Sequence, residues 1–242
     1  MKRLTLLSIC SLVLVHSVSA QTLIGLTEDA RVRSNPATDP NPATAFISST
    51  TSETSQAGFG GSPTAFNSAV LVFQLPTLGV GETFASAQLN FSAFKNSTPA
   101  FDADLYGLDR RASATVLGTD FFAGANDTRT FATLLQSSIL TPSLGTSMTF
   151  LSTNTTGNTN LTTFLNTQYA GGAGAGQYVF LRFNIDTAIH ENTINRYEVA
   201  TADNATASLR PSIDYISIPE PSTFVLLSVA FGTVLLLRKR RA

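Results

Sequence analysis

The C-terminal end of the chain joins three unlike segments: a tripeptide with two prolines, an apolar run and a basic cluster. Pro219-Glu220-Pro221 is followed by an apolar run from Phe224 to Leu237 and then by the basic cluster Arg238-Lys239-Arg240-Arg241. Each proline lacks an N–H and biases the preceding residue toward extended structure, so the tripeptide interrupts regular secondary structure. The apolar run predicts a transmembrane helix at about 223–237, which at about 1.5 Å per residue covers only some 23 Å of a roughly 30 Å hydrocarbon core. We therefore expect a marginal anchor, with the basic cluster as a cytoplasmic stop-transfer signal.

This C-terminal layout resembles the PEP-CTERM sorting signal of bacterial surface proteins. Three features carry the resemblance: the residues Pro219, Glu220 and Pro221, the short apolar run and the terminal basic cluster. The resemblance implies that an integral-membrane exosortase recognises the tripeptide and then releases or transfers the protein. Residues 218–242 are thus expected to be a sorting signal with a transient membrane span. The alternative is an ordinary single-span anchor that is never cleaved.

The other end of the chain has the anatomy of a secretory signal peptide. A basic pair precedes an apolar stretch at Leu4–Val15, and Ala20 ends a small-residue cleavage site. We therefore predict a signal peptide at 1–20, export through the Sec translocon and a mature chain that begins near Gln21. The only cysteine, Cys10, is removed with this peptide, so the mature protein can form no disulfide.

Charge is distributed unevenly between the two ends and the body of the chain. Six of the 15 basic residues lie in the membrane-directed ends, so the formal net charge of -1 conceals an acidic body. Residues 21–218 carry nine basic residues against 15 acidic ones, a net charge of about -6. This charge argues against nucleic acid and anionic lipid as partners of the body. About 200 residues without a dividing linker predict one domain, at 21–217.

The body consists of short apolar or alternating segments separated by turn residues, and these predict an all-β fold. Segment 69–75 is almost continuously apolar, as expected for a strand buried on both faces, and 87–92 alternates between apolar and polar residues. Phe73, Leu89 and Phe183 occupy inward positions of three such strands. Further strands are expected at 103–108, 178–185, 196–200 and 212–216.

Only one segment has helical spacing. Asn160 is the predicted N-cap of a helix at 161–165, and the glycine-rich segment Gly171–Gly176 leads into the next strand. The glycine spacing does not fit a nucleotide-binding loop, which would also need a helix after it. Many short strands with a single helix predict one jelly-roll-like antiparallel β-sandwich, flanked by the signal peptide and the transmembrane helix.

The order of these strands carries a second resemblance. The segments that carry it are Ala69–Pro76, Ser86–Phe91, Asp104–Leu108 and Leu209–Ile213. They are similar to the jelly-roll modules called DNRLRE domains. Those modules occur in secreted bacterial proteins and are related to carbohydrate-binding modules. The resemblance implies a jelly roll and adds extracellular polysaccharide as an expected ligand.

Few residues of the mature chain suit catalysis. His190 is the only histidine that remains after the signal peptide is removed, and no nucleophile motif accompanies it, so we interpret it as a loop residue. Asp102 and Asp104 lie two apart at the start of a strand and therefore face the same side. That placement fits solvent or an ion at least as well as acid–base catalysis. We predict no catalytic residue, no metal site and no cofactor.

Sugar binding is the leading alternative activity. The chain has no tryptophan, so Tyr106, Tyr178 and Tyr197 are the candidate stacking residues. Tyr178 with Arg182, four apart on one strand face, leaves a tyrosine–arginine lyase open. We predict an exported, exosortase-sorted, non-enzymatic protein that passes through the inner membrane to the bacterial cell surface or extracellular matrix. The alternatives are a surface-displayed carbohydrate-binding module, which exposed tyrosines would favour, and a polysaccharide-active enzyme.

Overall fold

The computed structural model describes residues 20–34, 44–47, 51–59, 62–79, 81–122, 124, 126–169, 174–186 and 194–219. These residues form antiparallel strands and a single α-helix, which confirms the predicted all-β class. The strands are β1 (Ala20–Ile24), β2 (Ala30–Ser34), β3 (Thr44–Ile47), β4 (Thr51–Phe59), β5 (Ser62–Gln74), β6 (Glu82–Asn96), β7 (Ala103–Arg111), β8 (Ala132–Leu140), β9 (Thr149–Ser152), β10 (Tyr178–Ile185), β11 (Ile194–Ala200) and β12 (Ser212–Pro219), and the helix is α1 (Thr155–Gln168).

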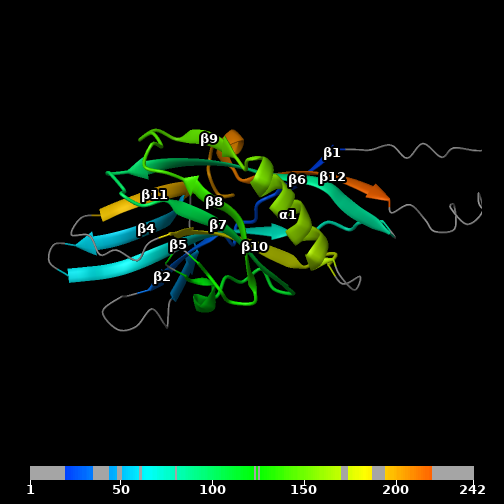
Figure 1. Cartoon of the computed structure of the whole chain (residues 1–242), viewed down its shortest axis with the longest axis horizontal. Helices are drawn as coiled ribbons and strands as arrows, with labels where there is room; N and C mark the ends of the chain where they lie inside the picture. Colours follow the sequence, from blue (N-terminus) through cyan, green and yellow to red (C-terminus); the bar gives the residue numbers. More distant parts are fainter. Residues whose placement is uncertain are drawn as a thin grey trace, which may run out of the picture.

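The strands are joined by one hydrogen-bonded path that curls back on itself (Figure 1). Its order is β1-β12-β6-β11-β4-β5-β10-β7-β8, with β2 paired to β5 and β9 paired to β6 as branches. Phe91 in β6 and Phe183 in β10 have ring centroids 5.0 Å apart. In a flat sheet, strands four places apart would be roughly 19 Å apart. The two halves of the path therefore pack face to face around an apolar core.

The strongest predicted strands lie where the sequence places them. β10 has the predicted bounds, segment 69–75 covers the second half of β5, and 87–92 lies within β6. Phe73, Leu89 and Phe183 are each 0% exposed, which confirms their assignment to the core. β10 and residues 69–73 of β5 are buried for almost their whole length, so these strands are covered on both faces.

Two predicted boundaries differ from the structure. The N-cap of α1 is Asn154, whose side chain accepts a hydrogen bond from the Gly157 N–H at 2.9 Å, so the prediction of Asn160 as the cap is wrong. β12 continues past the predicted end of the domain at 217 and pairs its last residue, Pro219, with Glu82. A proline is tolerated at this position because the end of a strand needs no further N–H donor.

α1 closes one side between the two halves of the sheet (Figure 1). The Asn166 side chain donates to the carbonyl of Phe84 in β6 and accepts from its N–H, both at 2.9 Å. Gln168, two residues further along the helix, accepts from the Arg110 N–H of β7 at 2.8 Å. The helix thus supplies side-chain partners to backbone groups of both halves, which would otherwise lack them.

None of the helices in the described ranges has the length and apolar character needed to cross a membrane. The predicted signal peptide up to residue 19 and the predicted transmembrane helix at 223–237 lie outside the described residues. The same holds for Glu220, Pro221, the basic cluster at 238–241 and His190.

Candidate functional site

The outer face of β10 is covered by the connection between β7 and β8, residues 112–131. Arg182 lies in the middle of β10 on this face and is 0% exposed. Its guanidinium donates to the Asp127 carboxylate at 2.7 Å, to the Asp120 carbonyl at 3.0 Å and to the Asn184 side-chain oxygen at 3.1 Å. All three partners are fixed in position, so the guanidinium serves as a structural link between strand and connection.

A second arginine completes a buried ion-pair cluster around Asp127. Arg129 donates to the two Asp127 oxygens at 2.8 and 2.6 Å, so one carboxylate lies between two guanidinium groups. Burial alone would raise the pKa of Asp127, but hydrogen bonds from Arg129 and Arg182 outweigh it and lower the pKa below its usual value. Burial lowers the pKa of Arg182 to about 10, against the opposing effect of Asp127, so Arg182 stays charged at neutral pH.

Further hydrogen bonds fasten the same connection to the sheet. The Ser68 hydroxyl donates to the Phe122 carbonyl at 2.8 Å, and the Gly124 N–H donates to the Ile185 carbonyl at 3.0 Å. Strand β10 is therefore buried on both faces for most of its length. A flat ligand cannot reach this sheet face without displacing the connection.

The candidate stacking tyrosines are mostly inside the fold. Tyr106 is 2% exposed and lies beside Arg182, 5.0 Å from the guanidinium carbon to the ring centroid. Tyr197 is 0% exposed, and its hydroxyl donates to the Phe101 carbonyl at 2.7 Å. Tyr178 is half-buried at the start of β10. The tyrosine next to Arg182 is thus its cross-strand neighbour Tyr106, rather than the Tyr178 that the sequence suggested.

Of the predicted aspartate pair, Asp104 is buried and supports the fold at the start of β7. Asp104 is 5% exposed and accepts from the Ser138 N–H at 2.8 Å, where β8 is irregular and Ser138 has a φ of 50°. Burial raises the pKa of Asp104, and the nearby Asp186 and Asp102 raise it further. Within the ranges that the structure describes, no three His, Cys, Asp or Glu side chains form a group that could hold a metal ion.

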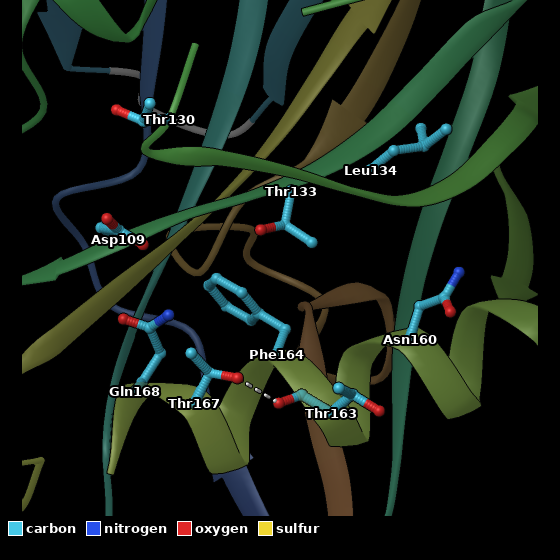
Figure 2. A pocket seen from close by; sticks show the side chains of 9 residues that line it. All are labelled: Asp109, Thr130, Thr133, Leu134, Asn160, Thr163, Phe164, Thr167 and Gln168. Carbon is cyan, nitrogen blue, oxygen red and sulfur yellow. Dashed lines mark hydrogen bonds between the residues drawn. The ribbon is translucent and has the colours of Figure 1, made fainter. Parts of the chain in front are cut away.

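An open groove lies between α1 and the strands β7 and β8 (Figure 2). It has a volume of about 360 Å³. We call it the helix–strand groove, and its lining residues are Asp109, Thr130, Thr133 and Leu134 from the strand side and Asn160, Thr163, Phe164, Thr167 and Gln168 from α1. Its floor is Phe164, 2% exposed, and its rim consists of hydroxyl, carboxamide and carboxylate groups.

Close packing beneath the groove fixes its floor. The Phe164 ring lies against Gly107 of β7, where an added Cβ would come within 2.8 Å of ring atoms. Only glycine leaves room for the ring at this position. α1 is therefore held at a fixed height over the strands, and the groove follows from that packing.

Sequence reasoning missed this groove because three separate segments build it. Asp109, Thr133 and Asn160 belong to different elements, and no short motif contains them. The only available signal was an excess of threonine around one helical segment, which indicates a polar surface without indicating a cavity.

The two ends of the described body lie side by side. Ala20, the predicted cleavage residue, is exposed and pairs with Ile216, and Gln21 pairs with Tyr215. The Tyr215 hydroxyl also donates to the Gln21 side-chain oxygen at 2.5 Å. β1 and β12 run antiparallel, so the start of β1 and Pro219 at the end of β12 lie at the same end of the body (Figure 1).

Comparison with known proteins does not assign a family. No protein-family model matches the chain, and no curated protein is similar to it.

Proposed function

We propose that the chain is an exported, non-enzymatic protein of the bacterial cell surface or extracellular matrix, sorted by an exosortase that acts at Pro219-Glu220-Pro221. In this proposal residues 1–20 are removed after export through the Sec translocon, and the C-terminal span is transient. The curled antiparallel sheet is, in the same proposal, a jelly-roll-like β-sandwich. It acts as an envelope or matrix component through its surface.

The pairing of β1 with β12 is the observation that carries this proposal. When a precursor has a membrane-directed segment at each end, both segments can reach the same bilayer without additional chain if the body begins and ends on one side. The antiparallel register of Ala20 with Ile216 supports that arrangement, because both ends of the body then lie at one side. A body with its ends on opposite sides would have to span the distance with additional chain.

The placement of the aromatic and charged side chains supports a structural role over the two alternatives. Tyr106 and Tyr197 are buried, so they offer no stacking platform for a glycan. Arg182 is fully buried and hydrogen-bonded to Asp127, so its guanidinium does not face a cleft in which it could act with a tyrosine base. These features favour a stable, displayed domain.

Replacement of the motif carboxylate tests the sorting step. In a host with an exosortase, Glu220→Ala should leave full-length protein in the inner membrane, because the enzyme would no longer bind the tripeptide. Ser222→Ala, next to the motif but outside it, is the matched control and should be processed normally. The measurement is the distribution of the protein between inner membrane and cell surface on immunoblots of fractionated cells. Equal processing of both variants would mean that the tripeptide is not the recognition element.

A further inference from the structure

The last residues of β12 reach into the Pro-Glu-Pro tripeptide. Pro219, its first residue, belongs to the strand and pairs with Glu82 of β6 (Figure 1). An enzyme that binds a peptide in extended form pairs with the backbone of that peptide, and here β6 lies beside it. We propose that residues Ser217–Pro219 detach from β6 and that the exosortase binds the tripeptide only in this opened state. The inference rests on the proposed function, because it concerns the same sorting step.

A break in the register separates these three residues from the rest of β12. Ile216 pairs with Ser86, but Ser217 pairs with Phe84, so Ala85 of β6 is left over as a β-bulge. A bulge interrupts the ladder of hydrogen bonds and bends the strand that carries it. The pairing beyond the bulge can therefore open without disturbing the pairing before it.

The second neighbour of β12 ends at the same point. β1 pairs with β12 as far as Ile216, which lies opposite Ala20. Residues 212–216 thus lie between two strands, whereas residues 217–219 pair with β6 alone among the described strands. A segment that is held on one side opens at a lower cost than a segment that is held on both.

Only one of the three pairs beyond the bulge can hydrogen-bond through its backbone. Phe84 donates its N–H to the Asn166 side chain and accepts from it at the carbonyl, both at 2.9 Å, so its backbone groups point away from Ser217. Hydrogen-bonded and non-hydrogen-bonded pairs alternate along antiparallel strands. Thr83 and Ile218 therefore form the hydrogen-bonded pair, and the pairs on either side of it do not.

The end of β6 keeps its other contacts when this segment leaves. Glu82 donates its N–H to the Gly79 carbonyl at 3.0 Å, and its carboxylate accepts from the Gly79 N–H at 2.9 Å. Ile218 is already 39% exposed, so its detachment uncovers little apolar surface. Opening thus costs chiefly the hydrogen bonds between Thr83 and Ile218, and water can replace these.

The strand before the bulge provides the matched comparison. Leu89 turns its backbone groups to Thr153, which accepts from its N–H and donates to its carbonyl, each at 3.0 Å. By the same alternation, Ser86 and Ile216 form a hydrogen-bonded pair. The N–H groups of Ile216 and Ile218 thus have the same kind of partner on the two sides of the bulge.

Amide hydrogen exchange tests the opening without an exosortase. The full chain is kept in detergent micelles, and exchange is followed by NMR. After correction for intrinsic rates, the Ile218 N–H should exchange at least about 100-fold faster than the Ile216 N–H, because only Ile218 is released by the local opening. Equal protection of the two amides would show that β12 opens as one unit and would overturn the proposal.

Two engineered disulfides test whether sorting needs the opening. Thr83→Cys with Ile218→Cys fastens the segment beyond the bulge, and Ser86→Cys with Ile216→Cys fastens the strand before it. Each pair lies directly opposite at a hydrogen-bonded position, where Cα atoms are roughly 5.5 Å apart, a distance that a disulfide can span. Cys10, the only natural cysteine, lies in the predicted signal peptide and is removed with it.

The two disulfides should affect sorting differently in a host with an exosortase. The disulfide beyond the bulge should slow release from the inner membrane at least about tenfold, and a reducing agent should restore the normal rate. The disulfide before the bulge should leave the rate unchanged with or without the reducing agent. The measurement is a pulse-chase of fractionated cells. A normal rate for the first variant, or an equal delay of both, would overturn the proposal.

Failure of the proposed function would give a different result. An unsubstituted chain that stays in the inner membrane would contradict sorting itself, and the role assigned to the opening would fall with it. Normal sorting of both disulfide variants would leave the proposed function intact and contradict only the control of access by β12.

Discussion

Arg182 shows how one residue determines the role of a whole sheet face. It stands in β10, which is buried for almost its whole length, so an unpaired guanidinium there would be very costly. The partner that neutralises it, Asp127, comes from a connection 55 residues away in the sequence. The sequence does contain a signal, since an arginine inside an apolar strand requires a carboxylate. It does not say which of the 15 body carboxylates is the partner, because that depends on the path of residues 112–131.

The cluster predicts an asymmetry between its two ionic partners. Asp127→Asn should lower the free energy of unfolding by about 3 to 5 kcal/mol, because it leaves the Arg182 charge buried without a carboxylate. Arg182→Met should cost less, since it removes the buried cation and leaves Asp127 paired with Arg129. Urea unfolding of both variants at neutral pH measures the difference. A larger loss for Arg182→Met than for Asp127→Asn would contradict the account.

Asp29 predicts how stability changes with pH. Its side chain is fully buried and accepts from the N–H groups of Val72 and Ala202 at 2.7 and 2.9 Å. Burial raises the pKa of Asp29 to about 7 despite these hydrogen bonds. The folded state therefore holds a proton that the unfolded state has lost between about pH 4 and pH 7. In this window the free energy of unfolding should fall as the pH rises, by up to about 1.4 kcal/mol per pH unit.

Unfolding at several pH values, with a matched pair of variants, checks this prediction. Asp104 and Asp186, whose pKa values are also raised, act in the same direction, so some slope will remain in any single variant. Asp29→Asn should flatten the slope between pH 4 and pH 7, whereas Asp109→Asn, at an exposed position that does not influence the pKa of Asp29, should keep it. Equal slopes for the two variants would show that Asp29 does not titrate in this range.

At the scale of elements, the sequence predicted that α1 exists but gave neither its bounds nor its cap. Helical spacing at 161–165 indicated that a helix exists, but the helix is longer and begins at Thr155. Asn154, Asn160 and Asn166 are all reasonable caps by residue type, and only the Gly157 N–H contact identifies the true one. The other two contact strands instead, which propensity cannot reveal.

Asn166 provides a test of the role of α1 as a cover for strand edges. Asn166→Ala removes the partner of both the N–H and the carbonyl of Phe84, so it should cost about 1 to 3 kcal/mol of unfolding free energy. Thr159→Ala, on the exposed side of the same helix, is the control and should stay within about 0.5 kcal/mol of the unsubstituted chain. Thermal and urea unfolding give both values. Equal values would mean that water replaces the Asn166 contacts without cost.

Strands were predicted well where burial makes their sequence apolar or alternating. They were predicted poorly where their strand state depends on pairing with a neighbouring strand. β5, β6 and β10 form the core, and their apolar runs or alternation identified them. β1 and β9 are mostly exposed edge strands, and β4 is rich in Ser and Thr, so none of them shows a hydrophobic pattern. Their strand state comes from hydrogen bonding to a neighbour already in place, which is a tertiary effect.

At the scale of the whole molecule, the two ends and the body give complementary information. The described body is an antiparallel fold with an ion-pair cluster around the buried Asp127 and a polar groove beside α1, and it begins and ends at neighbouring strands. The order of charged, apolar and Pro-Glu-Pro segments at the ends indicates an exported precursor. A precursor processed at both ends would leave β1 and β12 paired from Gln21 to Ile24, because the predicted cut after Ala20 removes only the first pair, Ala20 with Ile216.

Mass spectrometry of the protein extracted from the surface of an exosortase-containing host tests this account most directly. Peptides across the body should be recovered, with an N-terminus at Gln21 and none from Phe224 to Ala242. Recovery of the C-terminal peptide from the surface-extracted protein would contradict the proposed sorting and reduce the segment to a permanent anchor.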